Sequence, residues 1–123
     1  MNTTNKEIAQ NNKIIAEFMI KQEPTENFCV GSIGQEVGVF TGIKTEYFKY
    51  EDLKFHSDWN WLMEVVEKIE SIGYSYSTYL SGNVRVVNFQ SIINYNLIGG
   101  TLQETTYNAC LEFIKYYNEQ KKV

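Results

Sequence analysis

The sequence is poor in the residues that small proteins use to bind metals or to form stabilising cross-links. Its 123 residues include one histidine, one proline and two cysteines. Cys29 and Cys110 lie far apart and outside any CxxC pattern, so a zinc site made of Cys and His56 has too few ligands. We expect both cysteines to be free thiols, with a disulfide as the alternative, and we expect no metal and no cofactor.

Basic residues are also scarce. Eleven Lys and Arg face fifteen Asp and Glu, which gives a net charge of -4, and Arg85 is the only arginine. Proteins that bind duplex DNA neutralise phosphates with clustered basic side chains, and the lysines here are dispersed. We therefore expect no direct binding to duplex DNA.

Long hydrophobic runs are missing as well. No stretch approaches the roughly 20 apolar residues of a membrane span, and the first residues contain no apolar signal region. We expect no membrane association and a cytoplasmic location. Hydrophobic residues make up 43% of the chain, and neither repeats nor a linker are visible, so we expect one globular domain over residues 1–123.

Three segments have helical periodicity. Residues 5–20 carry apolar side chains at helical spacing, after a capping box formed by Thr4 and Glu7. The Asn11-Asn12 pair is expected to weaken this helix, and Pro24 is expected to end it. A second helix is predicted over 57–72, with Ser57 as the N-cap and an apolar arc of about 200° that includes Trp61. Thr101 and Glu104 form a capping box that opens a third helix, ending near residue 120. Its apolar arc spans about 180° and includes Leu102, Tyr107, Cys110, Leu111, Phe113, Ile114 and Tyr117.

The remaining segments predict strands. Residues 37–40 and 47–50 indicate short strands or extended loops among the turn glycines of residues 28–50. Alternating residues after Gly73, then residues 84–89 and 92–98, indicate a three-stranded meander. We therefore predict an α+β fold, in which a C-terminal antiparallel meander and short N-terminal strands pack against two or three helices.

Catalytic patterns are weak. His56 and Ser57 are adjacent, a spacing that rarely gives a base and a nucleophile the required geometry, and Ser57 is needed as a cap. Glu64 and Glu67 could form an acid–base pair or bind a divalent metal, but no second acidic motif completes such a site. A solvated helix face explains them more simply. We expect a protein that is not an enzyme.

Aromatic side chains are plentiful, at 15% of the chain. Core packing explains most of them, but Tyr and Trp are also preferred anchors at protein interfaces. An RNA-recognition fold also stacks bases on aromatic strands, yet its glycine–aromatic signature and basic neighbours are missing here. We expect the partner-binding residues to be Trp61, Tyr79, Glu64, Glu67 and Arg85.

One segment carries a resemblance. Residues 53–70, LKFHSDWNWLMEVVEKIE, resemble the hallmark of a group of short, uncharacterised bacterial and phage proteins. Residues 12–19 and 107–118 are similar to the opening and closing helices of that group. Glu64 stands where the group usually has proline, which favours an uninterrupted helix. The resemblance implies a mobile-element protein that inhibits a host factor.

These observations predict a small, non-catalytic interaction protein. The resemblance implies that it is phage-encoded, acts in the host cytoplasm, and inhibits a host defence or nucleic-acid-processing complex, so its partner would be a host protein or ribonucleoprotein. An acidic surface can occupy a basic groove. The alternative is a nucleotide or small-ligand binder, a homo-oligomer, that uses the glycine-rich residues 31–42 with Tyr79 and Arg85.

Overall fold

The chain divides into two compact units, Met1–Lys54 and Phe55–Val123, which are described separately. The computed structural model describes residues 5–22, 28–82, 84–90, 93–98 and 100–121. Thr4 and Pro24, expected to cap and end the first helix, lie outside these residues. The expectation of a single domain over residues 1–123 stays a prediction.

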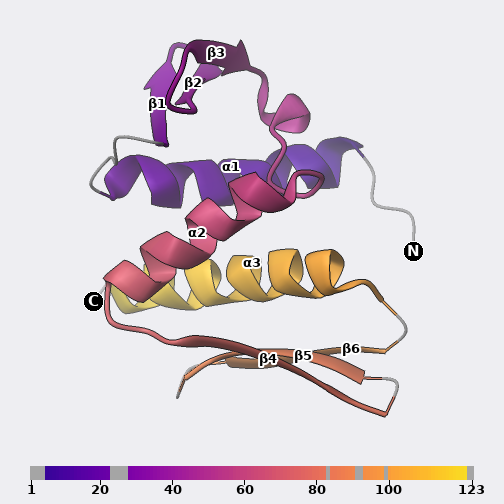
Figure 1. Cartoon of the computed structure of the whole chain (residues 1–123). Helices are drawn as coiled ribbons and strands as arrows, with labels where there is room; N and C mark the ends of the chain where they lie inside the picture. The colour runs from indigo at the N-terminus through magenta and orange to yellow at the C-terminus, as the bar shows by residue number, and fades with distance from the viewer. Residues whose placement is uncertain (1–4, 23–27, 83, 91–92, 99, 122–123) are drawn as a thin grey trace. The chain divides into compact units, whose positions relative to one another are not determined.

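The first unit contains one long helix and a three-stranded antiparallel sheet (Figure 1). Strand β2 lies at the centre, between β1 and β3, and its Val37 and Val39 are buried. The elements are α1 (Asn5–Lys21), β1 (Cys29–Ile33), β2 (Glu36–Phe40), β3 (Thr45–Phe48) and the single 3-10 turn η1 (Tyr50–Asp52). The predicted helix and both predicted strands are present.

Two details of the first unit differ from the prediction. Gly31, expected to be a turn glycine, lies inside β1 opposite Gly38, whereas Gly34 does occupy the β1–β2 turn at φ 60°. Tyr50, expected at the end of a strand, begins η1 instead. Glycine is depleted in strands, so the sequence alone favoured a turn at Gly31.

Asn12 joins α1 to η1. Its side chain is fully buried, and its Nδ2 donates hydrogen bonds to the backbone carbonyls of Tyr50 at 2.9 Å and Leu53 at 3.2 Å. The helix continues through Asn11 and Asn12 without a break. Asn12, which was expected to weaken α1, therefore holds the segment that follows β3 against this helix.

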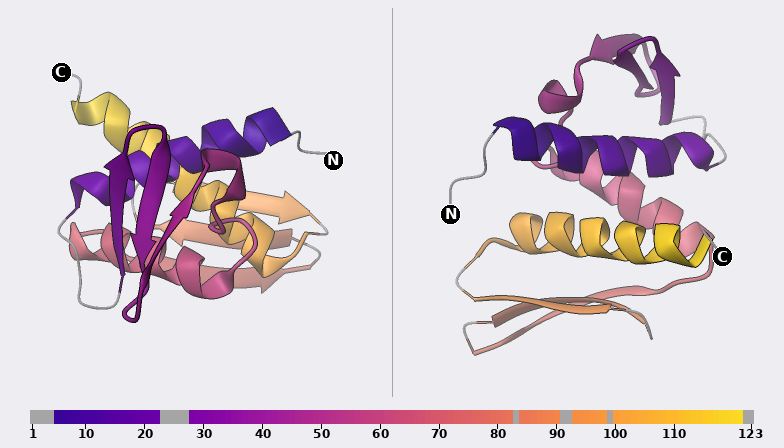
Figure 2. Two further views of the ribbon diagram at one scale, coloured as in Figure 1. Left: turned by 90° about the horizontal axis from the view of Figure 1, so that it is seen from above. Right: turned by 180° about the vertical axis from the view of Figure 1, so that it is seen from behind.

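The second unit places two helices on one face of a second antiparallel sheet (Figures 1 and 2). Strand β5 lies between β4 and β6, as the predicted meander requires. The elements are α2 (Trp59–Ser71), β4 (Tyr76–Ser81), β5 (Val84–Phe89), β6 (Ile93–Ile98) and α3 (Leu102–Lys121). Ser81 pairs with Val84, so β4 extends one residue further than predicted.

The N-cap of α2 corrects the prediction. Asp58, not Ser57, caps the helix, and its carboxylate accepts hydrogen bonds from the backbone N–H groups of Asn60 at 2.9 Å and Trp61 at 3.4 Å. Ser and Asp are comparable N-caps, so two adjacent candidates cannot be separated by residue type. The carboxylate has the advantage of carrying a negative charge at the positive end of the helix.

Helix α3 begins as predicted. The backbone N–H of Glu104 donates to the hydroxyl of Thr101 at 3.0 Å, and that hydroxyl donates to the Glu104 carboxylate at 3.1 Å. The buried face of the helix contains Thr105, Thr106, Tyr107, Ala109, Cys110, Leu111, Phe113 and Ile114. The two threonines were not predicted there; the Thr105 hydroxyl donates to the carbonyl of Thr101, and the Thr106 hydroxyl bonds to that of Tyr76.

In the described part of the chain, three helices and two antiparallel three-stranded sheets confirm the predicted α+β class. Among the residues that the structure describes, no helix is both long and apolar enough to cross a membrane.

Candidate functional site

The two faces of the β4–β6 sheet differ in what covers them. Side chains alternate between the faces along each strand. Phe89 lies on the face toward α3, where its ring is 5.1 Å from Phe113 and 5.7 Å from Tyr76, centroid to centroid. The opposite face carries neither helix of this unit (Figures 1 and 2).

We call this opposite side the open face. By the pairing register, the members whose side chains the structure describes are Ser77, Tyr79, Val84, Val86, Asn88, Asn94 and Asn96. The serine, the tyrosine, Asn94 and Asn96 are exposed, and Tyr79 has 52% of its surface in solvent. Val86, on the central strand opposite Tyr79, is 3% exposed. The open face therefore combines amides, hydroxyls and one large aromatic ring.

None of these seven open-face residues is charged. Arg85 is the only charged residue in the three strands, and it occupies the same face as Phe89. Its Nε donates a hydrogen bond to the carbonyl of Gly100 at 2.6 Å. Arg85 and Tyr79, both expected to bind a partner, thus lie on opposite faces of one sheet and cannot form one site.

Trp61 has a core-like environment. It is 7% exposed, and its ring meets that of Phe55 edge to face at 5.3 Å between centroids. A buried indole offers a partner little surface. Trp59, two residues earlier, is 37% exposed. The more exposed tryptophan of this helix is therefore not the one that was predicted to bind a partner.

The acidic candidates lie on the exposed side of α2. Glu67 is exposed and Glu64 is half-buried. Burial raises the pKa of Glu64, and the neighbouring carboxylate of Glu67 raises it further, while Lys68 opposes both effects. Two carboxylates in this setting repel one another, and within the described residues no cluster of three or more His, Cys, Asp or Glu could hold a metal ion.

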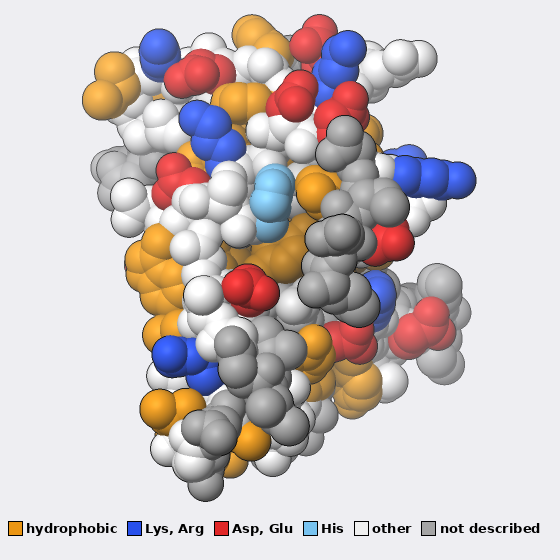
Figure 3. Space-filling model, turned by 90° about the vertical axis from the view of Figure 1, so that its right-hand side faces the viewer, with side chains coloured by type: hydrophobic (Ala, Val, Ile, Leu, Met, Phe, Trp, Pro, Cys, Tyr) orange, Lys and Arg blue, Asp and Glu red, His pale blue; other side chains and the backbone are white. Residues whose placement is uncertain are grey.

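His56 is half-buried, and its side chain is visible at the surface in pale blue in Figure 3. Its Nδ1 is buried and has no hydrogen-bond partner among the described residues, and its ring lies 6.0 Å from that of Tyr107. The backbone carbonyl of His56 accepts a hydrogen bond from Gln103 Nε2 at 3.1 Å.

Burial lowers the pKa of His56 below its usual 6.5. The unfolded chain therefore binds this proton more tightly than the folded chain, and stability is expected to fall as the pH falls below 6.5. Thermal unfolding across this range should show that His56→Gln reduces the fall. The raised pKa of Glu64 has the opposite effect on stability at lower pH, because the folded chain binds that proton more tightly than the unfolded chain. Glu64 is present in both the wild type and His56→Gln, so comparing the two proteins cancels its contribution. Equal slopes for both would contradict the prediction.

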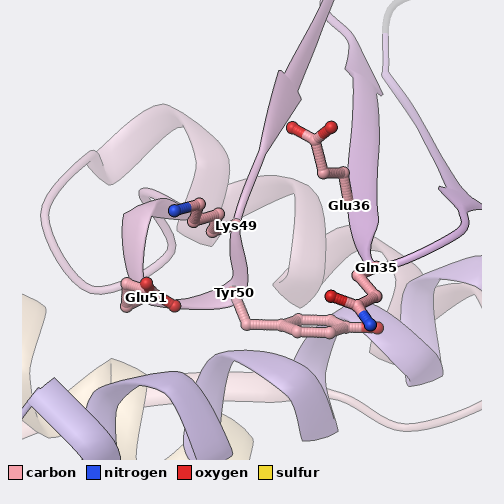
Figure 4. Close-up of a pocket in the computed structure, with 5 residues that line it drawn as sticks. All are labelled: Gln35, Glu36, Lys49, Tyr50 and Glu51. Carbon is pink, nitrogen blue, oxygen red and sulfur yellow. The ribbon is translucent and has the colours of Figure 1, made fainter.

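The first unit contains a hollow of about 560 Å³, lined by Gln35, Glu36, Lys49, Tyr50 and Glu51 (Figure 4). Two carboxylates and one ammonium line it, so its charge does not favour a phosphate. The Tyr50 ring forms the floor, above α1. The Lys13 ammonium lies over this ring, 5.8 Å from the ring centroid, in a cation–π contact.

The glycine-rich segment forms a sheet and its turns. Gly31 and Gly38 are paired strand residues, and a Cβ atom on Gly38 would meet Tyr47 Cε1 at 3.2 Å. The tyrosine ring therefore occupies the space that Gly38 leaves. Gly34 and Gly42 adopt positive φ angles outside the strands. These glycines belong to the first unit, whereas Tyr79 and Arg85 belong to the second.

Both cysteines are free, which confirms the first of the two alternatives. Burial strongly raises the pKa of the Cys110 thiol, so it stays protonated and unreactive.

Comparisons with protein-family models, with curated proteins and with solved structures find no match to this chain.

The sequence-based choice found Tyr79 but missed the rest of the open face. Asn94, Asn96 and Val86 carry no motif, and each is an ordinary strand residue by itself. The signal that could have found them is the scarcity of charge in the three strands together. Each strand has six residues, and only one of these eighteen residues is charged. Depletion of charged residues distinguishes the core of an interface from the rest of a protein surface.

Proposed function

We propose that this chain is a non-catalytic protein-interaction protein that holds its partner on the open face, with Tyr79 as the anchor. The observation that supports this is the combination of exposure and neutrality across three neighbouring strands. Interface cores are depleted in charged residues and enriched in tyrosine. The partner surface that fits is a flat, uncharged protein surface with hydrogen-bonding groups.

Charge favours a protein over a nucleic acid here. Phosphates are bound by Lys and Arg, and the open face has neither. Its amides and hydroxyls donate and accept hydrogen bonds, as the backbone and amide groups of a protein partner do. The hollow lined by Glu36, Lys49 and Glu51 is the best candidate for the alternative function, but two carboxylates against one ammonium suit a nucleotide poorly.

The partner that we propose is a host protein or ribonucleoprotein complex, which a phage-encoded inhibitor would block in the cytoplasm. The supporting observations are the net charge of -4 and the exposed Glu67 and Glu70 of α2. Negative charge of this kind accelerates encounter with a basic partner, and salt weakens the effect. Neutral contacts at Tyr79 would then hold the complex.

Affinity capture with paired variants tests the proposal. Tyr79→Ser removes the anchor, and Tyr47→Ser is the matched control, because Tyr47 is 56% exposed on the other sheet. We expect the wild type and Tyr47→Ser to retain the same protein from a lysate of the host cell. Tyr79→Ser should bind that protein at least about tenfold more weakly in a purified binding assay, since a tyrosine anchor contributes about 2 kcal/mol or more. Equal binding by all three, or no retained protein, would overturn it.

A further inference from the structure

Strand β4 presents its backbone to an open edge. The backbone N–H of Gln90 donates to the carbonyl of Ser75 at 2.9 Å, and the register continues from there through Ser77–Asn88 and Tyr79–Val86. Hydrogen bonding alternates along an antiparallel strand, so residues 75, 77 and 79 direct their backbone groups toward β5. The N–H and C=O groups of Tyr76, Thr78 and Leu80 therefore point away from the sheet.

This edge lacks the usual protection against pairing. Edge strands normally carry a charged side chain, a proline or a bulge that stops another strand from adding. The sequence of β4 is YSTYLS, and its pairing with β5 is regular over all six positions. Thr78, Tyr79 and Leu80 are all exposed, Leu80 at 59%. The second half of β4 is thus open along its edge and on both faces.

We propose that a second copy of this chain occupies this edge, so that β4 of each copy pairs antiparallel with the other. The two sheets would become one continuous six-stranded sheet around a two-fold axis. The axis passes midway between the two copies of Thr78, which lie opposite each other. Tyr76 then lies opposite Leu80 of the second copy, and each opposed pair exchanges both backbone hydrogen bonds.

Side-chain chemistry supports this register. Tyr76 and Leu80 share the helix-covered face of the sheet, because they are separated by an even number of positions. The exposed Leu80 of one copy would pack on the half-buried Tyr76 ring of the other, at both ends of the paired strands. A shift by two residues in either direction would remove this apolar contact and leave one outward backbone group of β4 without a partner.

Charge and area favour a second copy over a foreign strand. Each chain carries a net charge of -4, yet β4 has no charged residue, so two copies meet here without a charged pair in contact. Three strands of six residues cover about 14 Å by 20 Å, or about 300 Å². A stable interface needs about 800 Å² on each partner. A second copy, unlike a foreign strand, places two open faces side by side, about 600 Å² together, which comes closer to this area and carries two Tyr79 anchors.

The other edge of the sheet is a weaker candidate. In β6 the outward backbone groups belong to Asn94 and Asn96, by the same alternation. Both side chains are exposed amides, which keep this edge hydrated. Strand β6 therefore serves as the internal control for the experiment.

The mass in solution tests the proposal. The wild type should elute at twice the 14.3 kDa chain mass in size-exclusion chromatography with light scattering. Thr78→Pro should give a monomer, because proline removes an outward N–H and no bond of the β4–β5 ladder. Asn96→Pro makes the same change at the β6 edge and should stay a dimer. Thr78→Lys, which adds a charge without a backbone change, should also give a monomer if Thr78→Pro fails to fold.

A disulfide tests the register. Thr78→Cys should cross-link two chains under mild oxidation, since opposed residues in this position have Cα atoms about 5.5 Å apart, within the range that a disulfide spans. Ser77→Cys should not, because Ser77 lies opposite Tyr79 of the second copy. Both variants are made with Cys29→Ser, so that the buried Cys110 is the only other thiol.

Each result has a defined meaning. A monomeric wild type, or a dimer that survives both Thr78 variants, overturns the proposal. Cross-linking of the Ser77→Cys variant as readily as of the Thr78→Cys variant overturns the register. Tyr79→Ser is expected to stay a dimer, because its backbone faces β5 and its side chain lies on the open face. Loss of partner capture in a protein that is still dimeric therefore reports on the open face alone.

Discussion

Replacing Phe113 by alanine is expected to lower the free energy of unfolding by about 3–5 kcal/mol. The side chain is fully buried in the second unit. Its ring lies 4.8 Å from Tyr74, 5.1 Å from Phe89 and 6.1 Å from Tyr117, so it joins α3 to β5 and to the segment before β4. Truncation removes this transfer free energy and leaves a cavity between helix and sheet.

Urea denaturation followed by circular dichroism measures the effect. Lys115→Ala, two residues further along the exposed side of the same helix, is the control and should stay within about 0.5 kcal/mol of the wild type. The free energy of unfolding of small domains is about 5–15 kcal/mol, so Phe113→Ala is expected to remove a large part of the stability. A loss below about 1 kcal/mol would show that α3 does not depend on this ring.

Phe113 was predictable because its helix is long and periodic. The helical wheel placed it on one arc with Cys110 and Ile114, and all three are buried. The same argument worked for the alternation of β4–β6. It did not predict β1, where Gly31 interrupts the strand pattern and the strand is held by its pairing with β2. Pairing between strands is a tertiary property that a local window does not contain.

The candidate site was predicted less completely, and for a related reason. Tryptophan is suited both to cores and to interfaces, so residue type could not separate Trp61, which is buried, from Trp59, which is partly exposed. Tyr79 was selected as an aromatic residue on a strand. Which face it occupies, and that this face carries no charge, follows only from the register of three strands.

Replacing Asn12 by alanine is expected to lower the free energy of unfolding by about 2–3 kcal/mol, because it removes two buried hydrogen bonds and leaves their acceptors without a donor. Those acceptors are the carbonyls of Tyr50 and Leu53, at the exit from the β1–β3 sheet. The sequence suggested the reverse, since asparagine is a poor helix former and alanine the best. The gain in helix propensity, about 0.6 kcal/mol, is too small to offset the loss.

Asn11→Ala separates these two effects. Asn11 precedes Asn12 on α1 and is half-buried, so its replacement should yield the propensity gain without a comparable loss. Hydrogen exchange should locate the damage from Asn12→Ala at η1 and the end of β3, where protection falls, while the β4–β6 sheet keeps its protection. If both asparagine variants are equally stable, the carbonyls at η1 find other donors and α1 does not fix this turn.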